Sequence, residues 1–124
     1  MIQRNKKNSD TENKPTRFYS KIQEKNVAKA IDGKRTPNSG ATPLVKGDVI
    51  ADEFLLECKT KTTDSESMTI KKSWIEKNEK EALFMGKPHS AIVFNFGINS
   101  KNYYVLNEDD FLEYIQFLKN KNIT

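Results

Sequence analysis

The chain has 124 residues, of which 35% are hydrophobic and 31% charged, and its formal net charge is +4. This length suits a single domain, and no apolar run approaches the ~18 residues of a membrane span. The single cysteine excludes an internal disulfide. We therefore expect a protein of a reducing cytoplasm, without a membrane partner.

Residues 1–17 are polar, lack aromatic side chains and are rich in Lys and Asn. This composition predicts a disordered, basic arm, followed by one domain over residues 18–124. A basic arm is typical of nucleic-acid-binding proteins. A solvated terminus that binds nothing has the same composition.

A helix is predicted over residues 20–32, with Ser20 as its N-cap and Gly33 at its end. Glu24 falls on the apolar stripe of this helix, because the stripe residues follow it at intervals of three, four and seven. A buried carboxylate needs a partner such as a basic group or a metal-bound water. Alternatively, Glu24 lies at the edge of the stripe and pairs with a lysine of its own helix. The stripe consists of Ile22, Val27, Ala28 and Ile31.

Residues 33–46 contain two glycines and two prolines and are expected to be mostly loop, with room for a short strand. Arg35 offers a guanidinium group and Ser39 a hydroxyl group, and both suit a phosphate. The Asn-Ser-Gly sequence at Ser39 is equally typical of an ordinary turn.

Two short apolar runs, Val49–Ala51 and Phe54–Leu56, flank the polar pair Asp52-Glu53 and predict a β-hairpin. With a two-residue loop, residue 51 faces residue 54. The same register then places Asp48 opposite Glu57.

Opposed residues point to the same face of a hairpin, and alternation adds Lys59 to the face of Asp48 and Glu57. Two carboxylates this close repel each other unless a cation or a proton lies between them. Oxygen ligands favour Mg²⁺ or Mn²⁺ over zinc. The same residues also fit an ordinary surface hairpin with a Lys–Glu pair, since a change of register would separate them.

Asp48, followed by an apolar strand and then Glu57-Cys58-Lys59, resembles the signature of the PD-(D/E)XK nuclease superfamily. Together with two upstream motifs, this signature occurs in the same order as in the Holliday junction resolvases of archaea and phages, and the resemblance covers roughly residues 20–107. Gly47 stands where the family name has proline, which leaves the chemistry unchanged. The upstream pieces are Glu24 and the run Arg35-Thr36-Pro37-Asn38-Ser39-Gly40-Ala41.

The resemblance implies an α/β domain with a mixed central β-sheet flanked by helices, as in restriction endonuclease cores. It implies a Mg²⁺-dependent DNA endonuclease, with Mn²⁺ as a substitute, that cuts four-way junctions as a homodimer. Asp48, Glu57 and the main-chain carbonyl of Cys58 would hold the metal, and Lys59 would assist the attacking water. Glu24 would complete the acidic cluster. Ser39 and Arg35 would contact the phosphate.

A polar loop over residues 60–67 leads to a helix predicted from Met68 to Met85, capped by Ser67. Lys71 falls in its first turn, near the strand that carries Lys59, where we expect a phosphate contact. Trp74 is predicted to lie in the core, with stacking on a nucleobase as the alternative.

Strands are predicted over residues 89–97 and 103–106, and a last helix over residues 109–119 begins after Asn107. His89 has no second histidine or partner cysteine, so we expect a structural role. The predicted core face of the last helix comprises Phe111, Leu112, Ile115 and Leu118.

Two other functions stay open from the sequence. One is a recombination or repair nuclease of the same superfamily that acts on flaps, ends or mismatches. The other is a non-catalytic DNA-binding module. The clustered acids argue against it, because acidic side chains do not help a protein to bind phosphate.

Overall fold

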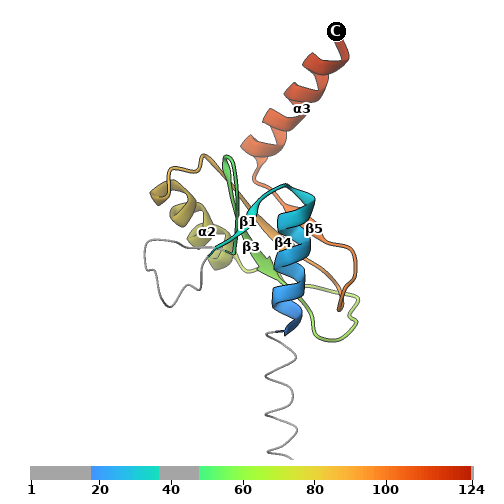
Figure 1. Cartoon of the computed structure of the whole chain (residues 1–124). Coiled ribbons are helices and arrows are strands. Elements are labelled where there is room, and N and C mark those ends of the chain that lie inside the picture. The colour runs from blue at the N-terminus through green and yellow to red at the C-terminus, as the bar shows by residue number, and fades with distance from the viewer. Residues whose placement is uncertain (1–17, 37–47, 124) are drawn as a thin grey trace, which may run out of the picture.

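A computed structural model of the chain describes residues 18–36 and 48–123 (Figure 1). A helix over residues 18–30 precedes a mixed sheet of five strands, with further helices between and after them, which confirms the predicted α/β class. The predicted arm, residues 1–17, and Ser39 lie outside the described residues. No described helix is long and apolar enough to cross a membrane. The elements after the first helix are β1 (Lys34–Arg35), β2 (Val49–Ala51), β3 (Phe54–Lys59), α2 (Lys72–Phe84), β4 (His89–Phe94), β5 (Tyr103–Val105) and α3 (Glu108–Ile123).

The strands follow one another in the sheet in the order in which they occur in the chain. β1, β2 and β3 are antiparallel, whereas β3 and β4 are parallel and α2 makes the crossover between them. Val49 pairs with Leu56 and Ala51 with Phe54, so the predicted hairpin and its two-residue turn are confirmed.

The two faces of the sheet are covered by different helices. Alternate residues of β2, β3 and β4 form a buried cluster with the helix of residues 18–30, as the apolar stripe predicts. On the other face, Asn78 of α2 is 2% exposed and donates to the carbonyls of Leu55 and Ala91 at 3.2 and 3.1 Å. The buried cluster on the first face consists of Val27, Ala28, Val49, Leu56, Ala91 and Val93.

The helix of residues 18–30 ends in a Schellman-type motif. The Gly33 N–H donates to the carbonyl of Ala28 at 2.7 Å, and Asp32 takes the positive φ of 55°. Gly33 is needed for a different reason, because a Cβ there would lie 2.5 Å from the Ile50 carbonyl oxygen. The predicted N-cap, Ser20, is wrong, since Ser20 lies within the helix.

α2 begins four residues later than predicted, at Lys72, and Lys71 occupies its N-cap position. The predicted cap, Ser67, is wrong because its amide binds the Ser65 hydroxyl, which in turn donates to the Ser67 carbonyl. This local turn competes with a helical start.

α3 begins as predicted, because the Asn107 side chain accepts from the Asp110 N–H at 2.8 Å. Its first turns are fixed to β4 through His89, whose Nδ1 and Nε2 lie 2.6 Å from Asp110 and 3.1 Å from Glu113. Beyond these turns α3 extends away from the sheet (Figure 1). The predicted core face is therefore wrong, with Phe111 50% and Leu112 54% exposed.

We predict that Asn78→Ala lowers the free energy of unfolding by about 2 kcal/mol, because it removes two buried hydrogen bonds that tie α2 to the sheet. Urea denaturation followed by circular dichroism measures this loss. Lys80→Ala, an exposed position of the same helix, is the control and should change stability by less than about 0.5 kcal/mol. Equal stability of both variants would show that Asn78 does not hold α2 on the sheet.

Candidate active site

Asp48 lies where β2 begins and is bonded to the partner strand through both its main chain and its side chain. Its N–H donates to the Leu56 carbonyl at 2.9 Å, although the register partner of Leu56 is Val49. Two consecutive residues thus oppose Leu56, as in a β-bulge, and the predicted pairing of Asp48 with Glu57 is wrong. The Asp48 Oδ2 atom accepts from the Cys58 N–H at 2.7 Å, which fixes the carboxylate across the end of the hairpin.

Glu57 and Lys59 lie on the α2 side of β3, where alternation along the strand places both. The Lys59 Nζ atom is 3.4 Å from the Glu57 Oε2 atom and 4.4 Å from the centroid of the Trp74 ring. Trp74 is half-buried rather than a core residue, and Lys71 Nζ lies 5.8 Å from the same ring. The ammonium group of Lys59 is therefore held between an acid and an aromatic face.

Glu24 reaches the same end of the sheet from the helix of residues 18–30. Its Oε1 atom lies 3.3 Å from the Nε atom of Arg35, and its side chain is 20% exposed. The partner expected for a carboxylate on this stripe is thus a basic group of the neighbouring strand β1 and not a lysine of its own helix. Arg35, predicted to bind phosphate, is engaged through one of its guanidinium nitrogens.

Two of the carboxylates at this end of the sheet, Asp48 and Glu24, have raised pKa values. Burial raises the pKa of Asp48 from 3.8 to about 6, and the charges of Glu57 and Glu24 add to this. The Cys58 amide and Lys59 oppose the rise without cancelling it. Burial also raises the pKa of Glu24, with Glu57 contributing and Arg35 opposing. Burial and the neighbouring acids thus both disfavour the ionised form of these two carboxyl groups.

Cys58 contributes its main chain and not a reactive thiol. Burial, followed by the charges of Asp48, Glu24 and Glu57, raises the pKa of the thiol, so the sulfur stays protonated at neutral pH. Cys58 is partly buried and packs against the core cluster.

Gln23 is the residue of this region that the sequence analysis missed. It is 3% exposed, and its Nε2 atom donates to the Lys59 carbonyl at 2.8 Å and to Asn102 Oδ1 at 3.2 Å. It thereby fixes the main chain that carries Lys59. Gln23 precedes Val27 by four residues, and this helical spacing was the available signal that it would be buried.

The acidic residues suit a hard divalent cation in their chemistry, because oxygen ligands with mutually destabilising negative charge favour such an ion. Across residues 18–36 and 48–123, no three Asp, Glu, His or Cys side chains lie close enough to hold a metal by themselves. Two carboxylates would need main-chain oxygens, water or substrate as further ligands. Mg²⁺ commonly binds in that way, with one or two carboxylates.

Comparison with known proteins gave no significant match among protein-family models, curated proteins or solved structures. The function is therefore inferred from the residues of this chain.

We predict that Asp48→Asn stabilises the metal-free protein at pH 7. The raised pKa means that stability due to the protonated carboxyl is present below pH 3.8 and is lost as the pH rises through about 6. The rise in pKa corresponds to at most about 3 kcal/mol, which partial solvent screening reduces to about 1–2 kcal/mol. Asn keeps an oxygen that accepts from Cys58.

Urea denaturation in EDTA at pH 4 and pH 7 measures this effect, and the advantage of Asp48→Asn should grow between the two. Asp52→Asn, at an exposed position of the hairpin turn, is the control and should follow the pH dependence of the unmodified protein. A variant no more stable than the unmodified protein at pH 7 would disprove the repulsion between the carboxylates.

Proposed function

We propose that the chain is a divalent-metal-dependent DNA endonuclease of the PD-(D/E)XK type that cuts branched DNA, with the four-way junction as its substrate. The observation that carries this proposal is the β2–β3 hairpin, whose end combines Asp48, Glu57 and Lys59 with Glu24 from the preceding helix. Three antiparallel strands followed by a helix and a parallel strand also support a restriction-endonuclease-like core.

In this proposal Asp48, Glu57 and the main-chain carbonyl of Cys58 hold Mg²⁺ or Mn²⁺. Such an ion, when bound, polarises the phosphoryl group and lowers the pKa of a bound water. The burial of Asp48 beside Glu57 and Glu24 supports this assignment, because a bound cation would favour the ionised carboxylate there.

Lys59 is proposed to stabilise the negative charge that develops on the phosphate during the attack of water. Its contacts with Glu57 and Trp74 restrict the ammonium group, and the bond from Gln23 restricts its main chain. A group restricted in this way loses less conformational freedom when the substrate binds. Glu24 completes the acidic cluster, and its charge is partly balanced by Arg35.

Lys71 and Arg35 are proposed to contact DNA phosphates. Lys71 lies over the same Trp74 ring as Lys59, which supports a continuous basic surface from the candidate site to the start of α2. Ser39 and the basic arm of residues 1–17 are additional phosphate contacts expected from the sequence alone. A homodimer acting in the cytoplasm would present two such sites to the two symmetric strands of a junction.

We predict that the protein introduces paired, symmetric nicks near the branch point of a labelled four-way junction with Mg²⁺ or Mn²⁺ but not with EDTA. Glu57→Gln should lower cleavage by at least about 100-fold, because it removes a charged metal ligand. Binding of the junction in Ca²⁺ or EDTA should be equal or tighter, since one negative charge near phosphate is lost.

Glu53→Gln is the matched control, because Glu53 lies on the turn of the same hairpin with a side chain that is 71% exposed. It should cleave like the unmodified protein. Cleavage of flaps or linear ends instead of junctions would keep the active site and change the substrate. Binding without cleavage in either metal would overturn the enzyme and leave a DNA-binding module.

We also predict that Lys71→Ala weakens DNA binding without unfolding the domain. If Lys71 neutralises one phosphate, the slope of log affinity against log salt should become shallower by about one. Fluorescence anisotropy at several salt concentrations measures the slope. Lys80→Ala, later on the same helix, should leave it unchanged, and an equal effect of both substitutions would remove Lys71 from the interface.

A further inference from the structure

The outer part of α3 exposes large apolar side chains that no described element covers. Phe111, Leu112, Tyr114 and Phe117 are 50, 54, 53 and 59% exposed. Tyr114 and Ile115 follow Phe111 by three and four residues, and Leu118 follows them by four and three, so the four residues share one side of α3. Contiguous apolar surface of this kind marks an interaction site in soluble proteins.

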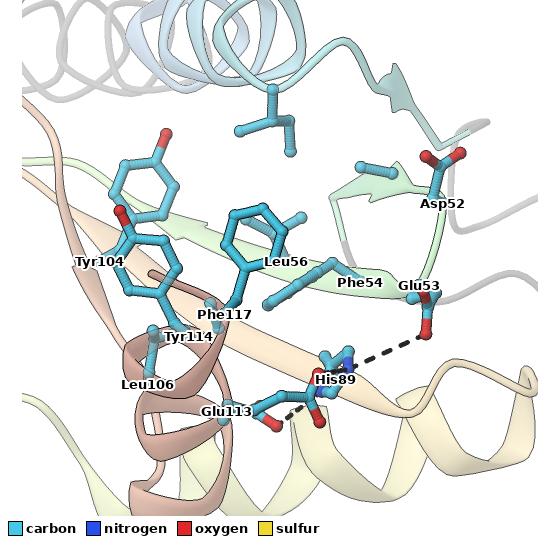
Figure 2. Close-up of a pocket in the computed structure, with 14 residues that line it drawn as sticks. Asp52, Glu53, Phe54, Leu56, His89, Tyr104, Leu106, Glu113, Tyr114 and Phe117 are labelled. Carbon is cyan, nitrogen blue, oxygen red and sulfur yellow. Dashed lines mark hydrogen bonds and ion pairs between the residues drawn. The ribbon is translucent and has the colours of Figure 1, made fainter. Parts of the chain in front are cut away.

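A groove lies between α3 and the body of the protein and continues this surface. It is a cavity of about 560 Å³. Figure 2 shows Tyr114 and Phe117 of α3 on one side and Phe54, Leu56 and Tyr104 of the sheet on the other. Its rim is acidic, with Asp52 and Glu53 on the hairpin turn and Glu113 on α3 (Figure 2). The groove therefore suits an apolar helix that carries basic residues.

α3 itself has these properties. Its acidic residues lie in the first two turns and its basic residues in the last turns, while aromatic side chains occupy the middle. An antiparallel pair of α3 helices places the basic end of each copy against the acidic start and rim of the other. The charged residues are Glu108, Asp109, Asp110 and Glu113 at the start, and Lys119 and Lys121 toward the end.

We propose that two copies of this chain associate through α3, antiparallel about a two-fold axis, with the apolar side of each α3 lying in the groove of the other. Such an interface is self-complementary and closes as a dimer. The acidic rim opposes DNA as the occupant, because phosphates would be repelled. The homodimer itself belongs to the proposed function, on which this inference rests; what is added is the position of the interface, and its tests measure association without measuring cleavage.

The available surface is of the right size. An aromatic side chain buries about 150–250 Å² when fully covered. Three half-exposed aromatic residues and Leu112 therefore offer about 400 Å² per copy. A stable interface buries about 800 Å² per partner. The groove lining and the flanks of α3, a helix of 16 residues and about 24 Å long, would supply the rest.

Analytical ultracentrifugation of the full chain tests the proposal. The expected result is a mass twice the 14.3 kDa of one chain at micromolar concentration. Phe117→Glu should raise the dissociation constant at least about 100-fold, whereas Leu83→Glu should leave the dimer intact. Leu83 is the control because it is 79% exposed on α2, away from the groove. Thermal melting checks that both variants fold.

Charge exchange tests the antiparallel arrangement without touching apolar residues. Lys119→Glu with Lys121→Glu should weaken self-association about 10-fold, and so should Glu108→Lys with Asp109→Lys. Mixing the two double variants should restore a dimer that contains one copy of each. A monomer at all concentrations up to about 100 μM, dimerisation lost in Leu83→Glu only, or no rescue on mixing would overturn the proposal.

Discussion

The register of the β2–β3 hairpin is the constraint on which the arrangement of the molecule depends. Val49 and Leu56 are buried on one side of the sheet only because the turn has two residues. A shift by one residue would turn Glu57 and Lys59 toward the helix of residues 18–30, and Leu56 and Cys58 toward α2. The hydrophobic core therefore specifies the register that places Glu57 and Lys59 on one face. Asp48 is placed by the bulge opposite Leu56 and not by that register.

The charges at the hairpin end are only partly compensated within the chain. Arg35, Lys59 and the Cys58 amide each stabilise one carboxylate, yet the pKa of Asp48 stays raised. A structure optimised for stability alone would remove one of these acids or add a cation. Retained repulsion of this kind is typical of sites that bind an additional cation or hold a proton for chemistry. The structure also contains a Lys–Glu pair, between Lys59 and Glu57, as an ordinary surface hairpin would.

The sequence predicted the features that depend on local periodicity and missed those that depend on tertiary contacts. Alternation gave the hairpin and the face shared by Glu57 and Lys59, and helical spacing placed Glu24 near the core. Gln23 and Asn78 are buried polar residues whose partners are main-chain carbonyls of distant strands, which periodicity does not report. Asp48 departs from its predicted pairing because a bulge is a property of the assembled sheet. The predicted start of α2 was wrong because Ser67, the expected N-cap, forms hydrogen bonds with Ser65 instead.

α3 shows a further limit of periodicity, because an apolar stripe indicates that a face will be covered but not by which molecule. The spacing of its apolar residues predicted a face buried in the core, but in the single chain Phe111 and Leu112 of that face are exposed. The His89 contacts with Asp110 and Glu113 fix the direction in which α3 leaves the sheet. A helix held in one orientation loses less entropy on association than a mobile one, so these contacts favour self-association. They lie at the start of β4, beside Phe54, whereas the acids lie at the other end of β3. An interface at α3 would therefore leave the candidate site open to a substrate.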